Sequence, residues 1–288
     1  MSDTPVWKLK FYGVRGSIPV CESTATEFGG NTTCFYLDLL IKPPEEKAIV
    51  IFDAGTGIRQ LGKDILSGLI PRTEYILIHF SHFHWDHIQG FPFFAPAYSP
   101  DQKIALFSPH FHAEDWDKLK GIFAQQMQRE YFPVQLDRMG ANMRFYSSEE
   151  FQERLSLDKH VKFSYYLHNH PGGAYSYRID GYGKSLVICT DIEHGETIDA
   201  ELVEFCRDVD VLVHDGQFTD EELIERRGWG HSSFSQAIEV AKQANVKKLY
   251  ITHHDPDHHD DFLRIVEKDC QAIFPNCFFA KEGIEVLI

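Results

Sequence analysis

The chain has 288 residues, of which 43% are hydrophobic and 14% aromatic. This composition provides a sizeable core for one large domain or two small ones, and it excludes a disordered chain. The sequence has no apolar run of about 18 residues, and its N-terminus lacks the basic and apolar pattern of a signal peptide. These features predict a cytoplasmic protein without a membrane span.

The formal net charge is -15. Such a charge disfavours long-range attraction to a nucleic-acid backbone, and no stripe of Lys and Arg offsets it locally. The charge therefore predicts a small-molecule substrate rather than a long nucleic acid. The six cysteines are scattered without a CxxC pair, which is typical of reduced, packed thiols.

Apolar runs rich in β-branched residues predict strands along the whole chain. In chain order they lie at 7–13, 33–41, 48–55, 74–80, 103–109, 161–167, 174–180, 185–191, 209–216, 248–254 and 284–288. Helical patterns stand between them at 56–68, at 199–208 and at 232–246, where Ser232 or Ser233 could act as the cap. This mixture predicts two similar α/β halves that are packed together.

The segment 91–158 is aromatic and rich in proline near its start. We expect a helix from residue 115, followed by a loop that ends by residue 139. The segment directly follows a cluster of candidate ligands, so we expect an insertion on the substrate side, as a wall or lid. Aromatic residues at 91–98 and 131–132 would suit stacking on a nucleobase, although core packing explains the same residues equally well.

The sequence SHFHWDH, at 81–87, follows a predicted strand. Side chains two apart in an extended segment point the same way, so His82 and His84 can bind one metal ion together. Asp86 and His87 face another direction and can bind a second ion. The pair His110 and His112 lacks this context and is interpreted as surface residues.

Two metal ions require further ligands from other strand ends. Asp191 follows a buried strand and could bridge both ions, and Asp53 could hold a ligand histidine through its second nitrogen. Strand-end position favours His170 and His253, but composition does not separate neighbouring histidines. The candidates are His168, His170, His253, His254, His258 and His259.

The motifs GVRGSIP, GGNTTC, FDAGTG, SHFHWDH, HNHPGGAYSYRI, ICTD, GHSS and ITHHDP together resemble the metallo-β-lactamase superfamily over nearly the whole chain. The resemblance implies one domain at 1–288 with the four-layer αβ/βα sandwich of that α/β fold, its metals in a cleft at the sheet edges. It also implies the ligand sets. One metal would be held by His82, His84 and His170, the other by Asp86, His87 and His253, with Asp191 bridging them.

LVHDGQFTDEE and GWGHSSFSQAIEVAKQA resemble paired segments of tRNase Z and related phosphodiesterases. The resemblance implies that Asp215 orients His231 for proton donation to the leaving oxygen. Asp here replaces the more usual Glu. The chain also lacks an evident glycine-rich and basic insertion of the kind that tRNase Z uses to clamp tRNA, which favours a smaller diester.

The resulting prediction is a dinuclear-metal phosphodiesterase that acts on a small phosphodiester, such as a cyclic nucleotide, through a metal-bridging hydroxide. The catalytic residues would be Asp86, Asp215 and His231. The ions would be zinc or manganese, with iron as a further option. No membrane partner is expected, and a homodimer is one option because related enzymes often form dimers.

Two alternatives stay open. The same site could hydrolyse a carboxylic ester, lactone or thioester, which does not obviously require the pair Asp215 and His231. A non-catalytic metal-binding protein is the other alternative, favoured if ligand positions were missing. Arg15 and Asn31 either line the cleft opposite the metals, where they would contact a phosphate, or form hydrogen bonds within their loops.

Overall fold

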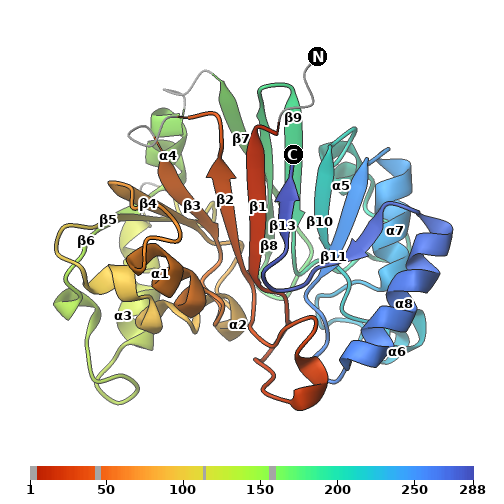
Figure 1. Cartoon of the computed structure of the whole chain (residues 1–288), viewed down its shortest axis with the longest axis horizontal. Helices are drawn as coiled ribbons and strands as arrows, with labels where there is room; N and C mark the ends of the chain where they lie inside the picture. The colour runs from red at the N-terminus through yellow and green to blue at the C-terminus, as the bar shows by residue number, and fades with distance from the viewer. Residues whose placement is uncertain (1–4, 43–46, 113–114, 156–159) are drawn as a thin grey trace. The chain divides into compact units, whose positions relative to one another are not determined.

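The structure is a computed structural model that describes residues 5–42, 47–112, 115–155 and 160–288 (Figure 1). The chain divides into two compact units. The first comprises the described parts of 1–13, 33–157 and 285–287, and the second comprises 14–32, the described part of 158–284, and residue 288. Each unit contains one β-sheet with its own helices.

The first unit contains a seven-stranded sheet. Its order is β13 (Glu285–Leu287), β1 (Trp7–Gly13), β2 (Cys34–Leu39), β3 (Ala48–Phe52), β4 (Tyr75–His79), β5 (Lys103–Phe107) and β6 (Asn142–Tyr146). From β3 to β6 the strands run parallel. The segments that leave β3 and β4 therefore start at the same edge of the sheet, and these segments carry Asp53 and the SHFHWDH motif.

The helices of the first unit complete its core. They are α1 (Ile58–Leu66), α2 (Trp85–Ile88), α3 (Trp116–Gln126) and α4 (Ser148–Leu155), with 3-10 turns η3 (Phe91–Phe93), η4 (Ala95–Tyr98) and η5 (Leu136–Arg138). On α1 the buried face is formed by Ile58, Leu61 and Ile65, which recur at helical spacing. These side chains pack with sheet residues such as Ile78 and Leu106 in one cluster.

The second unit contains a six-stranded sheet. Its order is β12 (Cys277–Phe279), β11 (Lys248–Thr252), β10 (Val211–Asp215), β9 (Lys184–Cys189), β8 (Ala174–Gly181) and β7 (Val161–His168). The strands β9 to β12 run parallel. Their shared carboxyl edge presents Asp191, Asp215 and His253, each at or just after the end of a different strand.

Within the described residues of the second unit, four α-helices and one 3-10 turn accompany this sheet. They are α5 (Ala200–Phe205), α6 (Asp220–Glu225), α7 (Phe234–Gln243), α8 (Asp260–Ile273) and η1 (Ser23–Ala25). Helix α7 packs on β10, β11 and α8 (Figure 1). It begins at a capping box in which Ser233 accepts from the Gln236 N–H and the Gln236 side chain accepts from the Ser233 N–H.

The expected strands and helices are confirmed, and the mixed α/β class with them. Strands β6 and β12 and helices α4, α6 and α8 were not predicted. The segment 91–158 was expected to be a wall or lid, but it also contributes β5, β6 and α3 to the first unit. In the described part of the chain, every helix is too short or too polar to cross a bilayer.

Buried His79 makes the stability of the fold sensitive to acid. Burial lowers the pKa of His79 to about 3, and its ring packs against Phe52, Phe107 and Phe151. The folded-state pKa is below the unfolded value of about 6.5, so the unfolded state binds one more proton between these two values. Stability should therefore fall as the pH drops through that window, by about 1.4 kcal/mol per pH unit for this group.

The variant His79→Phe should lose this contribution. Urea unfolding at several pH values within the window would show a dependence shallower than that of the wild type by about 1.4 kcal/mol per unit. His259→Phe, at an exposed position before α8, is the matched control and should keep the wild-type slope. Equal slopes for wild type and His79→Phe would contradict the prediction.

Candidate metal centre

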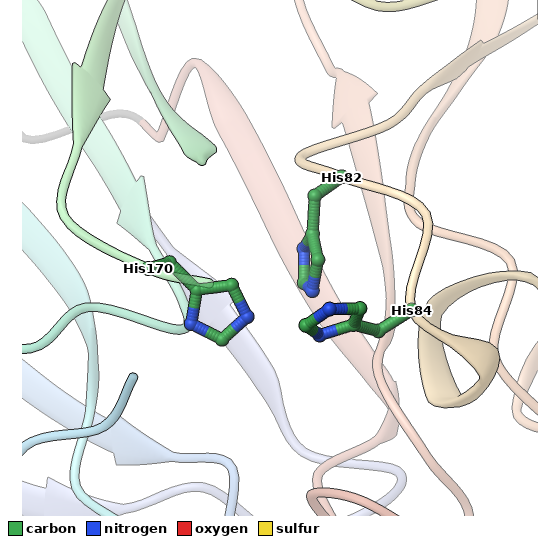
Figure 2. Close-up of side chains that lie close together, drawn as sticks. All are labelled: His82, His84 and His170. Carbon is green, nitrogen blue, oxygen red and sulfur yellow. The ribbon is translucent and has the colours of Figure 1, made fainter. Parts of the chain in front are cut away.

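The loop after β4 carries the first group of candidate ligands. His82 is buried, whereas His84 is exposed and precedes α2 without using its side chain as a cap. Their ring centroids lie 4.5 Å apart. Figure 2 shows both rings on this loop. Asp86 and His87 are buried on α2, and His87 Nε2 lies 3.4 Å from Asp86 Oδ2. The third ring in Figure 2, His170, belongs to the second unit.

Asp53 holds His87 in a fixed orientation. Its backbone has a left-handed φ of 59° directly after β3, a conformation that costs a non-glycine residue about 1–3 kcal/mol. The carboxylate accepts from the N–H and hydroxyl of Ser81, at 2.8 Å each, and lies 2.9 Å from His87 Nδ1. His87 Nδ1 is therefore the protonated nitrogen, and its Nε2 is left as the donor atom for a cation.

The second unit presents a carboxylate between two imidazoles. Asp191 Oδ1 lies 3.2 Å from His253 Nε2 and 4.0 Å from His170 Nε2. Asp191 and His253 both have left-handed backbones, with φ of 60° and 65°, at the points where the chain leaves β9 and β11. The turn at each strand end aims the side chain along the carboxyl edge of the sheet.

The carbonyl of Gly230 orients His170. His170 Nδ1 donates to this oxygen at 2.8 Å, which leaves Nε2 on the side of Asp191. The segment that contains Gly228 and Gly230 is held by Glu193. The Glu193 carboxylate accepts from the N–H groups of both glycines at 2.7–2.9 Å. Sequence reasoning missed Glu193, because an acidic loop residue without a motif carries no signal of this role.

Asp215 and His231 form a buried pair. Asp215 Oδ2 accepts from His231 Nδ1 at 2.9 Å, and Oδ1 accepts from the Ser232 N–H at 2.8 Å. The ring of His231 stacks on that of His253, with centroids 4.9 Å apart. His231 is 8% exposed, so its Nε2 can meet a group that enters from solvent. Asp215 can keep that Nε2 in a defined position.

The neighbouring histidines point elsewhere. His254 donates from Nε2 to the Ala280 carbonyl and stacks on Phe279, and burial, together with the Arg15 charge, lowers its pKa to about 3. Burial likewise lowers the pKa of His168 to about 3. His258 Nε2 lies 3.0 Å from Glu222 Oε1. Among these neighbours, His170 and His253 are the ones near the buried carboxylate.

Arg15 and Asn31 are engaged within their own loops. The Arg15 side chain is fully buried, and it donates to the carbonyls of Gly29, Asp255 and His258. Asn31 donates from its side chain and its backbone to Glu282. The geometry thus favours the loop-bonding interpretation of both residues over contact with a substrate phosphate.

The donor sets suit divalent cations in each unit. In both His87 and His170, Nδ1 donates a hydrogen bond to an oxygen acceptor. The Nε2 atom of each ring lies within 4.0 Å of a buried carboxylate oxygen. Neutral imidazole and carboxylate are preferred ligands of zinc and manganese, so the residues fit such ions.

Comparison with known proteins gives one family match and a set of relatives similar over almost the whole chain. Residues 49–254 match the family described as the beta-lactamase superfamily domain. Ribonuclease BN of Enterobacter sp. strain 638 is 25% identical over 332 residues, which cover 98% of this chain and all of that protein.

Two solved structures share the fold at lower identity. The short form of human tRNase Z is 17% identical with a TM-score of 0.67, over 98% of this chain and 99% of the other. A diphosphatase from the PhnP family is 17% identical with a TM-score of 0.64, over 98% and 97%.

The ribonuclease relative corrects one expectation from the sequence. The net charge predicted a small-molecule partner and argued against long nucleic acid, but proteins similar to this chain over almost its full length are named as ribonucleases. The prediction was wrong because net charge sums carboxylates over the whole surface. Charges more than about 10 Å from a site are largely screened by salt, so the sum says little about local binding.

Gly230 is required for the orientation of His170. Its φ is 93°, and a Cβ atom there would lie 2.2 Å from His170 Nδ1. Gly228 has a similar φ of 86°, but a Cβ there would meet nothing within 4 Å. Both substitutions to alanine strain the backbone, and only Gly230→Ala should displace the imidazole.

We expect Gly230→Ala to weaken zinc binding about 10- to 100-fold, the effect typical of lost support for a metal ligand. Gly228→Ala should bind zinc as the wild type does. Competition with a chromophoric chelator measures the affinity, and circular dichroism checks that both variants are folded. Equal zinc affinity of the two variants would show that the Gly230 carbonyl does not orient a ligand.

Proposed function

The chain belongs to the beta-lactamase superfamily, in its tRNase Z-like branch, and we propose that it is a dinuclear phosphodiesterase. Its metallo-β-lactamase fold is confirmed, and the protein is a hydrolase.

The pair Asp215 and His231 carries the proposal. A histidine whose Nδ1 is hydrogen-bonded to a buried carboxylate can donate a proton from Nε2 and is stabilised when positively charged. Hydrolysis of a phosphodiester with a poor leaving group needs such a donor, because the departing alkoxide is strongly basic. Acyl hydrolysis does not obviously need the pair, so its presence favours cleavage of a P–O bond.

The ligands proposed for two divalent ions come from both units, so we propose that 1–288 acts as one functional domain. One ion would be held by His82, His84 and His170, the other by Asp86, His87 and His253, with Asp191 shared between them. When bound, two such ions lower the pKa of water and neutralise negative charge on phosphoryl oxygens. Zinc and manganese both suit this set, and iron is a further option.

Side chains and a backbone carbonyl of the protein orient the ligands, attract the cations and donate the proton. Asp53 and the Gly230 carbonyl fix the protonated nitrogens of His87 and His170, so that each Nε2 is available for coordination. Asp86 and Asp191 supply negative charge that attracts the cations. Asp215 keeps Nδ1 of His231 protonated, and His231 donates the Nε2 proton to the departing oxygen.

The proposed substrates are phosphodiesters of nucleotides, with RNA among them. The relatives named as ribonucleases support RNA, and the likeness to a diphosphatase supports tests of smaller phosphate esters as well. A cyclic nucleotide, the substrate expected from the sequence, belongs to the same series. A cytoplasmic location stays a prediction.

Hydrolysis of bis(p-nitrophenyl) phosphate tests the reaction class. The protein is loaded separately with zinc and manganese, and a lactone and a thioester are assayed alongside. We expect turnover of the diester. Activity confined to the acyl compounds would overturn the proposal and leave Asp215 and His231 with a structural role. An RNA with a 3′ extension and a cyclic nucleotide then define the physiological class.

His231→Ala should separate proton donation from metal binding. Loss of a general acid typically lowers turnover about 10²- to 10⁴-fold, and the loss should be greatest for an alkyl leaving group. With p-nitrophenolate, which leaves without protonation, the effect should be much smaller. The metal content, measured by atomic emission, should remain that of the wild type.

His259→Ala, at an exposed position, serves as the control and should retain wild-type turnover. An unchanged rate of His231→Ala on the alkyl ester would refute proton donation by this residue. An equal loss on both leaving groups would also count against it, because the leaving-group dependence is the signature of the acid.

A further inference from the structure

A cavity in the first unit lies beside the SHFHWDH motif and has no role in the chemistry described above. It has a volume of about 420 Å³ and is bounded by side chains from the motif, from α3 and from the segment after α3. These include Phe83, Trp85, Ile122 and Tyr131. The volume lies within the range of small-molecule sites, about 300–1,000 Å³.

Two aromatic side chains at this cavity are unusually open to solvent. Trp85 is 63% exposed and Tyr131 is 73% exposed. Exposed rings of this size are not required by the core, and they gather at one cavity rather than lying scattered over the surface. Aromatic faces stack on nucleobases with little dependence on the base, because every base has a π-face.

The walls of the cavity are held in place by the core. Phe83 packs against Phe80, Phe111 and Phe123. Gln126 is 8% exposed and donates from Nε2 to the Ile88 carbonyl at 2.8 Å, which ties the end of α3 to α2. This bond assigns the other amide atom as oxygen. Gln126 Oε1 is buried and has no hydrogen-bond partner within the described residues.

The lining combines aromatic faces with amides. The side chains of Gln125 and Gln128 are exposed where α3 ends, and both border the cavity together with Gln126. Amides can donate to and accept from the edge of a base, and none of the described residues that line the cavity is charged. Stacking surfaces with a few neutral polar groups at the edge are the chemistry that recognises an unpaired nucleobase.

Trp85 places this cavity next to the proposed reaction centre. It stands between His84 and Asp86, and consecutive Cα atoms are about 3.8 Å apart. A ligand stacked on its indole would therefore lie about one nucleotide from a phosphate bound at the motif.

From these observations we propose that Trp85 and Tyr131 form a subsite for the nucleobase next to the scissile phosphate. The inference rests on the proposed phosphodiesterase function and names its substrate class as nucleotides with an unpaired base. It gives Trp85 a role in specificity: the indole binds the base and positions the phosphodiester, while the metal ligands on either side of it act on the phosphate.

A matched pair of substrates tests the subsite. Thymidine 5′-(p-nitrophenyl phosphate) carries a base, and methyl p-nitrophenyl phosphate has the same leaving group without one. For Trp85→Ala, the ratio of kcat/KM between the two esters should fall about 5- to 100-fold, mostly through KM. Trp85→Phe should retain most of the ratio, because phenylalanine preserves a stacking face. Tyr131→Ala should lower the ratio in the same direction.

Tyr75→Ala is the control, since Tyr75 is a partly exposed aromatic at the start of β4, at the opposite end of that strand from the motif. It should leave the ratio at the wild-type value. Titration of AMP against the zinc-loaded protein gives a readout independent of turnover. The tryptophan fluorescence of the wild type should be quenched, and this quenching should be largely lost in Trp85→Phe.

The outcomes separate the subsite from the reaction. Hydrolysis of neither ester by the wild type would overturn the proposed function itself. Hydrolysis of both with an unchanged ratio in Trp85→Ala would overturn the subsite alone. A change of Trp85→Ala in light-scattering mass, with loss of activity on both esters alike, would assign the aromatic cavity to a contact between copies of this chain and would also overturn the subsite.

Discussion

The buried carboxylate of Asp215 joins the segments from which the second unit builds its part of the centre. It accepts hydrogen bonds from the N–H groups of Asp191 and Ser232 and from Nδ1 of His231. A fully buried carboxylate is tolerated only when donors of this kind surround it. The end of β10 is thereby tied to the segment after β9 and to the loop before α7, and removal of this carboxylate would leave all three donors unpaired.

Asp53 performs the equivalent task in the first unit. Its carboxylate accepts from the N–H of Ser81 and from Nδ1 of His87, as that of Asp215 accepts from Ser232 and His231. Each aspartate lies at or just after the carboxyl end of a parallel strand, with a serine N–H on one oxygen and an imidazole on the other. The same local device thus orients a proposed metal ligand in one unit and a proposed proton donor in the other.

Left-handed backbone at the strand ends also recurs at the centre. Asp53, Asp191 and His253 all have positive φ although none is glycine. Such conformations persist where the surrounding hydrogen bonds and packing compensate for their cost, and here they turn the side chains along the carboxyl edges of the sheets. Backbone strain and buried charge therefore coincide at residues proposed to bind the metal ions or to orient their ligands.

The sequence by itself determined the α/β class, the expected strands and the clustering of candidate ligands at strand ends, because hydrophobic periodicity and short motifs are local signals. It missed β6, an edge strand with exposed side chains, and α8, whose apolar spacing stood beside a conspicuous run of histidines. Strand-end position and family resemblance favoured His170 and His253 over their neighbours, but only the tertiary structure gives the distances of their rings from Asp191. Ring orientation depends on distant partners such as Gly230 for His170 and Ala280 for His254. Glu193, the burial of Arg15 and the cavity beside Trp85 likewise depend on contacts between residues far apart in the chain, which no local pattern encodes.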